Sequence, residues 1–503
     1  MNLSEKAGII TFGNIIGRIS VILSGIVVAR WLTQQELGTF RQINLIFSTL
    51  GLILLLGIPS SLYYFIPRAE EKEKQGIITQ TFSTLALIGL FFSVIIYFSS
   101  PLFVRLFSNP ELLSLIHLYS PYFAFSLPYS AFFAVMMSLN KTLLATAIQL
   151  LCIVLLVLAT VVPVLLHCSL STVFTTMLTT TILLTFFVIF YSIRLSPPGS
   201  LTPSKTFAIK QFKFSFPLGL SQFATLIERE IDKVFISSYF TVKQFATYSI
   251  GAVELPISSI IGPAIRTVLL PDFSQKFHKN NIDEILNIWK ESRRKFALIT
   301  FPIILFFYFI SFEFITFMYS DKYTDSTLVF QIYLLIPFFD NFQSGVILHA
   351  KGKTKKLFYS SGIAVLLNIL LSFVLINTIG IIGPAIATCI SKFVAYSFVI
   401  KWASQELKIN NPTLMFPLKD YGRILISSFI AGSCILIFRH TGHVSSQFLF
   451  LALSSTIYFS VLLVCYVFFV FLPEDYFFLK SKFSKIKFLA KKLERLAHRE
   501  RLF

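Results

Sequence analysis

The stretch "YFSVLLVCYVFFVFL" (458–472) carries no charged side chain along its whole length. A second uncharged run, "LGLILLLGI" (50–58), lies near the other end of the chain, and similar runs recur between them. They are apolar on every side rather than along one helical stripe, which is typical of helices surrounded by apolar material. About 20 mostly apolar residues are enough to cross the ~30 Å hydrocarbon core of a bilayer. These runs predict a polytopic membrane protein.

The composition supports this interpretation. Of the 503 residues, 55% are hydrophobic and only 13% are charged, and the mean hydropathy is +0.77. Soluble domains carry about 25% charged residues. An outer-membrane barrel would need ~10-residue strands of alternating polarity, which the sequence lacks. No small-residue cleavage site follows the first apolar run, so we expect a span there rather than a secretory signal. The predicted fold class is all-α.

We predict about fourteen spans. They cover 8–31, 38–66, 77–99, 111–138, 142–165, 169–193, 215–240, 244–272, 294–318, 326–350, 357–378, 382–402, 421–439 and 447–472. Most of the 43 Lys and Arg residues fall in every second connection, on the side of the N-terminus. By the positive-inside rule, both termini are then cytoplasmic. The net charge of +19 then reflects basic residues that face the anionic lipids of the cytoplasmic leaflet. We therefore expect anionic membrane lipids as partners and no nucleic acid.

An internal repeat indicates two lobes. The motif "WLTQQELGTF" (31–40) matches "YFTVKQFATY" (239–248), with Thr33 aligned to Thr241, and "NKT" (140–142) later matches "GKT" (352–354). We therefore expect an N-terminal lobe of spans 1–6 (1–193) and a C-terminal lobe of spans 7–12 (194–402). Two further spans would occupy 403–472. Duplicated lobes of this kind, related by an axis along the membrane normal, occur in transporters.

Two segments have an amphipathic pattern. The basic tail, 473–503, places apolar residues on one helical face and Lys and Arg elsewhere, which predicts a helix on the cytoplasmic surface of the membrane. A disordered basic tail is the alternative. The segment "DEILNIWKESRRKF" (283–296) resembles a shorter version of the same pattern. Five scattered cysteines indicate neither a disulfide framework nor a metal site.

Charged side chains inside the spans are the strongest functional signal. A charge at mid-span costs about 2.5–3.5 kcal/mol on insertion scales, so such residues normally face a partner or a cavity. Span 7 contains "IEREIDKVF" (227–235), in which Arg229–Asp232 and Glu230–Lys233 are pairs of opposite sign at a spacing of three. The charges cover too wide an arc for one buried contact, which favours a hydrated cavity. A structural ion-pair network without a transport role is the alternative.

Arginine forks suit phosphate oxygens, so buried cations predict an anionic cargo. Nearby carboxylates could take up H⁺ or Na⁺ and couple transport to a gradient. The candidate substrate-binding residues are Arg18, Arg41, Arg229, Lys233, Arg266 and Lys392, and the candidate ion-coupling residues are Glu228, Glu230, Asp232, Glu254 and Asp340. No catalytic constellation, metal-ligand spacing or cofactor motif is recognisable, so we expect no enzyme and no cofactor.

Several motifs resemble those of the flippases that move lipid-linked oligosaccharides for O-antigen and capsule synthesis. These motifs are "ARWLTQQELGTF" (29–40), "EIDKVFISSYFTVKQFATYSI" (230–250), "AKGKTKK" (350–356) and "GIIGPAIAT" (380–388). The family belongs to the multidrug, oligosaccharidyl-lipid and polysaccharide exporter superfamily. The resemblance implies a multi-pass inner-membrane protein with spans 1, 2, 7 and 8 around a central cavity. Its cargo would be an oligosaccharide on a polyprenyl pyrophosphate, flipped by alternating access, and its partners would include other polysaccharide-assembly proteins.

Other functions remain open on sequence alone. A lipid II flippase or a drug exporter of the same superfamily would share the fold. A drug exporter would be expected to have an acidic or neutral apolar cavity rather than one with several cations. A membrane-embedded polysaccharide polymerase or ligase would typically need a large external loop, and the predicted connections are short.

Overall fold

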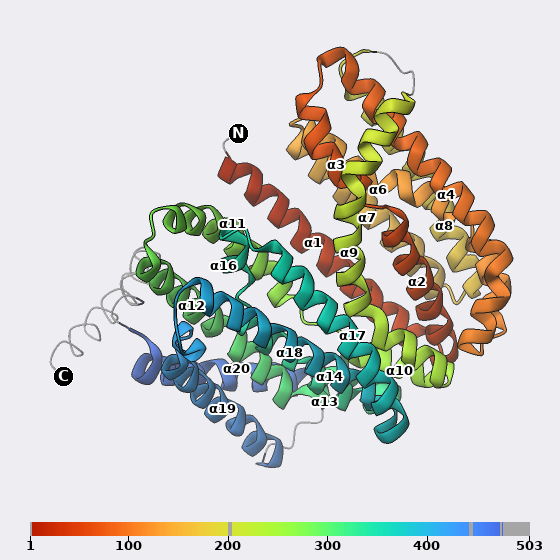
Figure 1. Ribbon diagram of the computed structural model, residues 1–503. Helices are drawn as coiled ribbons and strands as arrows, with labels where there is room; N and C mark the ends of the chain where they lie inside the picture. Colours follow the sequence, from red (N-terminus) through yellow and green to blue (C-terminus); the bar gives the residue numbers. More distant parts are fainter. Residues whose placement is uncertain (1–2, 200–203, 442–445, 473–474, 476–503) are drawn as a thin grey trace, which may run out of the picture. The chain divides into compact units, whose positions relative to one another are not determined.

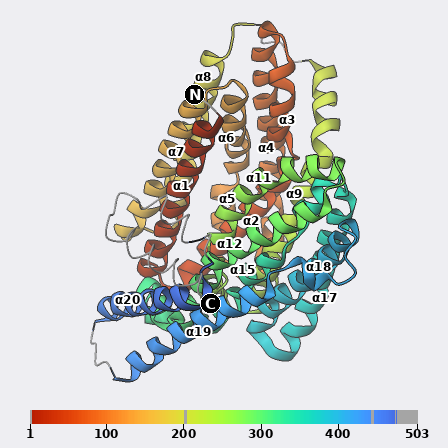
Figure 2. The same cartoon turned by 90° about the vertical axis from the view of Figure 1, so that its left-hand side faces the viewer.

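The computed structural model describes residues 3–199, 204–441, 446–472 and 475. Over these residues every regular element is a helix, which confirms the all-α prediction (Figure 1). The same helices are seen from a second side in Figure 2. The predicted cytoplasmic tail, 473–503, lies outside the described residues except for Asp475.

The first half of the chain forms long helices joined by short connections. They are α1 (Leu3–Trp31), α2 (Gln34–Leu54), α3 (Ile58–Phe65), η1 (Ile66–Arg68), α4 (Glu71–Phe107), α5 (Glu111–Tyr119), α6 (Tyr122–Ser138), α7 (Thr142–Leu165), α8 (Leu170–Leu195), α9 (Lys205–Tyr239) and α10 (Val242–Gly251).

The second half contains more interruptions. It forms α11 (Ile257–His278), α12 (Ile282–Phe309), α13 (Ser311–Tyr319), η2 (Asp321–Ser326), α14 (Thr327–Tyr333), α15 (Leu335–Phe339), η3 (Asp340–Phe342), α16 (Gly345–Ala350), α17 (Thr354–Ile379), η4 (Gly380–Ile382), α18 (Gly383–Glu406), η5 (Pro412–Met415), α19 (Leu418–Thr441), α20 (Gln447–Cys465) and the π-helical η6 (Tyr466–Val470).

Eight helical segments of the described chain are long and apolar enough to span a membrane, or nine if the bent pair α12 and α13 is one span. That pair is bent by 75°. The chain is therefore a multi-pass membrane protein. All fourteen predicted spans lie on helical segments, although several are interrupted, and the number fourteen stays a prediction.

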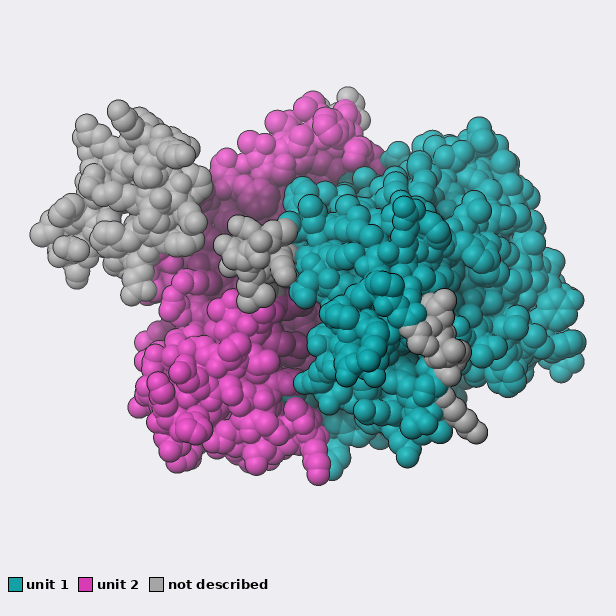
Figure 3. All heavy atoms as spheres, turned by 90° about the horizontal axis from the view of Figure 1, so that it is seen from above, with its two compact units in different colours: residues 1–253, 318–333, 357–395 teal, residues 254–317, 334–356, 396–503 magenta. Residues whose placement is uncertain are grey.

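The chain divides into two compact units (Figure 3). Unit 1 contains residues 1–253, 318–333 and 357–395, and unit 2 contains residues 254–317, 334–356 and 396–503. Each unit is described by itself below. The division into lobes at 193 and 402 remains a prediction.

In unit 1, the two repeat motifs begin helices in the same way. Thr33 caps α2 and Thr241 caps α10, and each forms a capping box, with Glu36 and with Gln244 respectively. The helices then approach closely, because Gly38 of α2 lies against the backbone of Val242, where a Cβ would come within 2.2 Å of the carbonyl oxygen. The matched sequences therefore specify matched local structure.

Unit 1 also includes residues 318–333, and this segment is hydrogen-bonded to the end of α1 and the start of α2. Arg30 Nε donates to the Met318 carbonyl at 2.9 Å, and Gln34 Nε2 donates to the Lys322 carbonyl at 2.6 Å. Lys322 Nζ returns two bonds, to the Arg30 and Leu32 carbonyls at 3.1 and 2.9 Å. Four hydrogen bonds thus join residues that are far apart in sequence.

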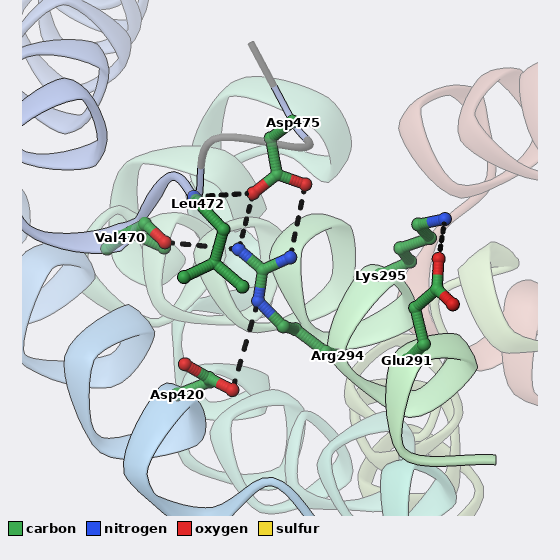
Figure 4. Close-up of polar contacts among 7 residues, drawn as sticks. All are labelled: Glu291, Arg294, Lys295, Asp420, Val470, Leu472 and Asp475. Carbon is green, nitrogen blue, oxygen red and sulfur yellow. Dashed lines mark hydrogen bonds and ion pairs between the residues drawn. The ribbon is translucent and has the colours of Figure 1, made fainter. Parts of the chain in front are cut away.

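In unit 2, α12 packs against α19, and α19 packs against α20. Arg294 of α12 binds the chain after η6: its guanidinium donates to both carboxylate oxygens of Asp475 at 3.1 and 2.5 Å and to the Val470 carbonyl at 3.1 Å (Figure 4). The position of 283–296 on the membrane surface stays a prediction. The segment is the first half of α12, and Trp289, Arg293 and Arg294 are buried within unit 2.

Two predicted spans break at acidic residues. Span 244–272 is interrupted between α10 and α11, where Glu254 precedes Pro256, because a proline disfavours helical geometry in the residue before it. Span 326–350 is divided into short helices around Asp340. The side chain of Asn341 stabilises that break by donating to the Pro337 and Phe338 carbonyls at 3.1 and 3.3 Å.

Candidate functional site

Unit 2 contains a cavity of about 280 Å³ with an unusual concentration of charge. Its polar lining consists of Glu254, Arg266, Arg293, Asp340, Gln343 and Tyr396. Apolar side chains such as Phe296 and Ile336 complete the wall. Glu254 and Asp340 come from the two helix breaks. Irregular backbone at membrane depth is tolerated where it lines a cavity, so the breaks and the cavity belong together.

Arg293 is the most deeply buried charge of this cavity. Only 6% of the residue is exposed, and its guanidinium carbon lies 4.3 Å from the ring centroid of Trp289 and 5.2 Å from that of Phe296. Its Nε has no hydrogen-bond partner among the described residues. Since a buried charge is costly unless it is paired, the aromatic stacking holds a cation that still has donor capacity for an anion.

Arg266 lies on α11 and is exposed toward the same cavity. It is close enough to Arg293 for the two positive charges to interact. Two neighbouring guanidinium groups repel each other when empty, and an anion with several oxygens between them would remove that repulsion. The pair therefore favours a ligand of more than one negative charge.

Asp340 is held at the cavity wall by Tyr396, whose hydroxyl donates to the Asp340 carboxylate at 2.8 Å. The carboxylate also interacts electrostatically with Arg293. The cavity thus contains both signs of charge, and a tyrosine hydroxyl binds one of its carboxylates.

The cavity brings together three of the residues predicted from sequence, Glu254, Arg266 and Asp340. Arg293 was not among the candidates predicted from sequence, because it lies in the amphipathic segment 283–296 and just outside the predicted span 294–318. One signal was present: Trp289 and Phe296 stand four residues before and three residues after Arg293. That spacing places both aromatic side chains on the helix face of the arginine.

The charged cluster of span 7 lies on α9, in unit 1. Glu230 accepts hydrogen bonds from Lys233 at 2.7 Å, as predicted, and from Arg229 at 2.9 Å. The predicted Arg229–Asp232 pair is wrong, because Arg229 binds the adjacent Glu230 instead. The backbone carbonyl of Glu228 accepts a bond of 3.5 Å from Asn368 of α17.

Asp232 is fully buried in unit 1 and contacts two tyrosines. The hydroxyls of Tyr248 and Tyr333 both donate to its Oδ2, the former at 2.6 Å. Its Oδ1 is buried and has no hydrogen-bond partner among the described residues. A carboxylate with one satisfied and one unsatisfied oxygen can accept a proton or contribute a ligand to a small cation.

The remaining predicted cations also belong to unit 1 and do not line the cavity. Arg18 is exposed on α1, and Lys392 is half-buried on α18. Arg41 of α2 is half-buried near Tyr319 and Tyr323, and its Nε has no partner among the described residues.

Comparisons with known proteins agree with this architecture. The lipid II flippase MurJ in its inward closed conformation has a TM-score of 0.73 and 20% identity, over 91% of this chain and 98% of that chain. An inward-facing multidrug resistance MATE family transporter of the MOP superfamily has a TM-score of 0.61 and 13% identity, over 78% of this chain and 94% of that one. The Vibrio cholerae MATE transporter VcmN in the bent form has a TM-score of 0.53 and 13% identity, over 82% and 98%.

These likenesses show that the chain has the fold shared by MurJ and the MATE transporters. No curated protein matches the chain. The family profile described as "Polysaccharide biosynthesis protein" matches residues 27–328, which is more than half of the sequence. The chain therefore belongs to the polysaccharide biosynthesis protein family, as the sequence motifs indicated.

Proposed function

We propose that this chain flips a polyprenyl-pyrophosphate-linked oligosaccharide across the inner membrane by alternating access, in the synthesis of a cell-surface polysaccharide. The family and the transporter fold support a lipid-linked cargo. The observation that carries the proposal is the buried, aromatic-stacked Arg293, which lies beside Arg266 in the charged cavity.

In this proposal, Arg266 and Arg293 bind the two phosphates of the carrier. A guanidinium presents donors in a fixed fork that matches phosphate oxygens, and stacking on Trp289 fixes the plane of the Arg293 fork before the cargo enters. The exposed Arg266 would meet the pyrophosphate first, and the buried Arg293 would hold it during the conformational change. The sugars and the polyprenyl chain need no specific contact with these two residues.

The carboxylates would couple transport to a cation gradient. Asp232 is the strongest candidate, because it is buried and its Oδ1 lacks a partner among the described residues. Glu254 and Asp340 line the cavity itself, where their negative charges could balance those of the two arginines after the cargo leaves. Glu228 and Glu230 are further candidates on α9. The coupling ion would be H⁺ or Na⁺.

Arg18, Arg41, Arg229, Lys233 and Lys392 are proposed as further cations along the transport route. In this proposal, the two six-span lobes move relative to each other during transport, and both termini lie in the cytoplasm. A lipid II flippase would use the same pyrophosphate chemistry, and the family match favours a polysaccharide precursor over it. A multidrug exporter is less compatible with two arginines in one cavity.

The test uses cells that depend on this protein for their surface polysaccharide. Arg293→Gln and Arg266→Gln should abolish surface polysaccharide and cause the lipid-linked precursor to accumulate, while the protein level in the membrane stays normal. Arg423→Gln is the matched control, because Arg423 is exposed at the start of α19 and does not line the cavity. Wild-type polysaccharide output from both cavity variants would contradict the proposal.

A second arm identifies the cargo. Purified protein in liposomes should translocate an oligosaccharide on polyprenyl pyrophosphate, and the same sugar on a polyprenyl monophosphate should be moved at least about tenfold more slowly, because one charge-assisted bidentate contact is lost. Equal rates for the two carriers would remove the roles assigned to Arg266 and Arg293.

A further inference from the structure

A second cavity, of about 640 Å³, lies in unit 1 where the C-terminal ends of α3 and η1 meet the beginnings of α4 and α9. It is separate from the charged cavity of unit 2 and shares no residue with it. Three aromatic side chains line it, Tyr64, Phe65 and Phe207. Three cations and one carboxylate also line it, Arg68, Lys72, Lys210 and Glu73.

The cavity lies at the end of an apolar stretch. On α4 its lining begins with Lys72 and Glu73 and continues inward through Gly76, Ile77 and Gln80. The predicted span starts at 77, so the charged part of the lining falls at the level of the lipid headgroups and the rest at the edge of the hydrocarbon. The distribution of Lys and Arg assigns this connection, 67–76, to the cytoplasmic side.

The walls of this cavity are fixed by hydrogen bonds among side chains that the ligand would not need to move. The Gln80 side chain binds both backbone groups of Ser204, accepting from its N–H at 2.9 Å and donating to its carbonyl at 2.7 Å. Gln211 donates to the Ser61 and Thr81 hydroxyls, both at 3.0 Å. Because these amides are satisfied, α3, α4 and α9 stay together without a bound molecule.

The aromatic lining is also packed in place. Phe65 contacts Phe207 edge-on, with ring centroids 5.2 Å apart, and Phe214 supports Phe65 and Tyr64 from behind at 5.3 and 4.6 Å. The Arg68 guanidinium lies 3.7 Å from the Tyr64 ring centroid, and Lys210 Nζ lies 5.8 Å from that of Phe65. These cation–π contacts hold two positive charges against an apolar floor.

The charges of the cavity are unequally compensated. Glu73 accepts the hydrogen bond of the Glu70 N–H at 3.2 Å, as part of the cap of α4, and Lys72 is paired with Glu70 at 3.4 Å. Lys210 has no ion pair or hydrogen bond from its side chain among the described residues, and Arg68 donates only to the Tyr64 carbonyl, at 3.2 Å. Two cations therefore remain available to an anion.

We propose that this cavity binds the phosphate diester headgroup of an anionic phospholipid of the cytoplasmic leaflet. Arg68 and Lys210 would contact the phosphate, Lys72 would add long-range attraction, and the glycerol and upper acyl chain would pack on Phe65 and Phe207. Basic pockets between membrane helices on the cytoplasmic side are suited to such headgroups. A lipid bound here would join η1, α4 and α9 on the lipid-facing side, and this role does not depend on what the protein transports.

The test measures lipid binding by the purified, delipidated protein in a non-ionic detergent. Native mass spectrometry counts bound phosphatidylglycerol and phosphatidylcholine, and thermal unfolding is recorded over the same titration. We expect phosphatidylglycerol to bind and to raise the Tm, and phosphatidylcholine to do neither at equal concentration. The variant Arg68→Gln/Lys72→Gln/Lys210→Gln should bind phosphatidylglycerol more weakly, by about fivefold for each cation removed.

The matched control is Lys353→Gln/Lys355→Gln/Lys408→Gln, which makes the same change in net charge at exposed lysines outside the cavity. It should bind like the wild type. An equal loss in the control would mean that only the net charge attracts the lipid, and it would overturn the proposal. If the triple variant fails to fold, the single variant Lys210→Gln, at an exposed position, should still weaken binding about fivefold.

A third arm distinguishes the source of the phosphate. Glycerol 1-phosphate and inorganic phosphate at millimolar concentration should not displace phosphatidylglycerol, because they lack the acyl chains that would pack on Phe65 and Phe207. Displacement by either compound would replace the lipid with a soluble phosphate ligand and contradict the proposal. Because no transport is measured, the result is independent of the outcome for Arg266 and Arg293.

Discussion

Arg293 and Arg294 are consecutive residues of α12 and are almost equally buried, with 6% and 5% exposed. Among the described residues, only Arg294 of the two forms ion pairs with carboxylates. Arg294 is bound by Asp475 and the Val470 carbonyl and lies 3.9 Å from Asp420 (Figure 4). Arg293 stacks on Trp289 and lines the cavity. Neighbouring side chains of a helix point about 100° apart, so α12 directs one cation to the fold and the other to the cavity.

The two arginines should therefore respond differently to the same substitution. Arg294→Gln removes one partner of a buried ion pair, which costs about 3–5 kcal/mol, and should lower the Tm of the purified protein strongly. Arg293→Gln removes a cation that has no ion pair in the described chain, and should leave the Tm unchanged or raise it. Thermal unfolding in detergent measures both.

Lys295→Gln is the control for this comparison. Lys295 is exposed and binds Glu291, which is also exposed, and such surface pairs contribute about 0–1 kcal/mol (Figure 4). A strong loss of stability in Arg293→Gln, equal to that of Arg294→Gln, would show that Arg293 has a structural role.

Arg293→Lys tests the geometry of the contact. Lysine keeps the positive charge but not the planar fork that binds two oxygens and stacks on Trp289. We expect the transport rate to fall by about tenfold or more, because one bidentate contact with the phosphate is lost. The flipping rate in liposomes measures it, with Arg423→Lys as the matched variant. Full activity of Arg293→Lys would mean that charge alone is needed.

The sequence was sufficient for the fold class because the apolar runs and the in-span charges follow directly from the physics of the bilayer. The sequence was not sufficient to predict that Arg293 lines a cavity. The pattern of 283–296 has an apolar stripe and a basic face, which fits both a surface helix and the buried start of α12. The difference lies in the contact between Arg294 and Asp475, residues too far apart in sequence for any local pattern to connect.

The partners of Asp232 could not be predicted from local sequence patterns either. The spacing of Arg229 and Asp232 fits an ion pair, but Arg229 binds Glu230, and Asp232 turns to Tyr248 and Tyr333. Tyr333 lies in α14, within the predicted span 326–350, and no sequence pattern in that span indicates a contact with Asp232. By contrast, the capping boxes at Thr33 and Thr241 use only residues that lie within the matched motifs.

Asp232→Asn should separate folding from ion coupling. The amide keeps the shape of the side chain and can still accept from the two tyrosines, so the protein should remain folded. It cannot carry the negative charge that would take up H⁺ or Na⁺. We expect transport in liposomes to become independent of imposed Na⁺ and pH gradients. Asp325→Asn, at an exposed position in η2, should keep the dependence of the wild type, and an unchanged response in Asp232→Asn would exclude Asp232 as the coupling site.

The capping boxes give a prediction about stability. Thr33→Ala and Thr241→Ala each remove the hydroxyl that accepts the N3 backbone N–H, and each should cost about 1 kcal/mol. Thr33→Ser and Thr241→Ser keep the acceptor and should be close to neutral. Thermal unfolding measures the four variants. A large loss in the serine variants would mean that the methyl group, rather than the cap, is the important feature.

Lys276 gives a pH-dependent prediction for the connection between α11 and α12. It binds Asp272 at 2.7 Å and Glu284 at 3.0 Å, and the hydrogen bonds to these two carboxylates raise the pKa of Lys276 above its usual value. A lysine whose pKa is raised on folding stabilises the folded state fully at pH values below its unfolded pKa of about 10.4. That contribution is lost as the pH rises through the higher pKa of the folded state.

The Tm of the wild type should therefore exceed that of Lys276→Met by a constant amount from pH 7 to 9, and the difference should shrink above pH 10.5. Lys279→Met, next to the same connection but outside the pair, should show no such pH dependence, and a difference for Lys276→Met that persists unchanged to pH 11.5 would show that the alkyl chain rather than the charge stabilises this connection.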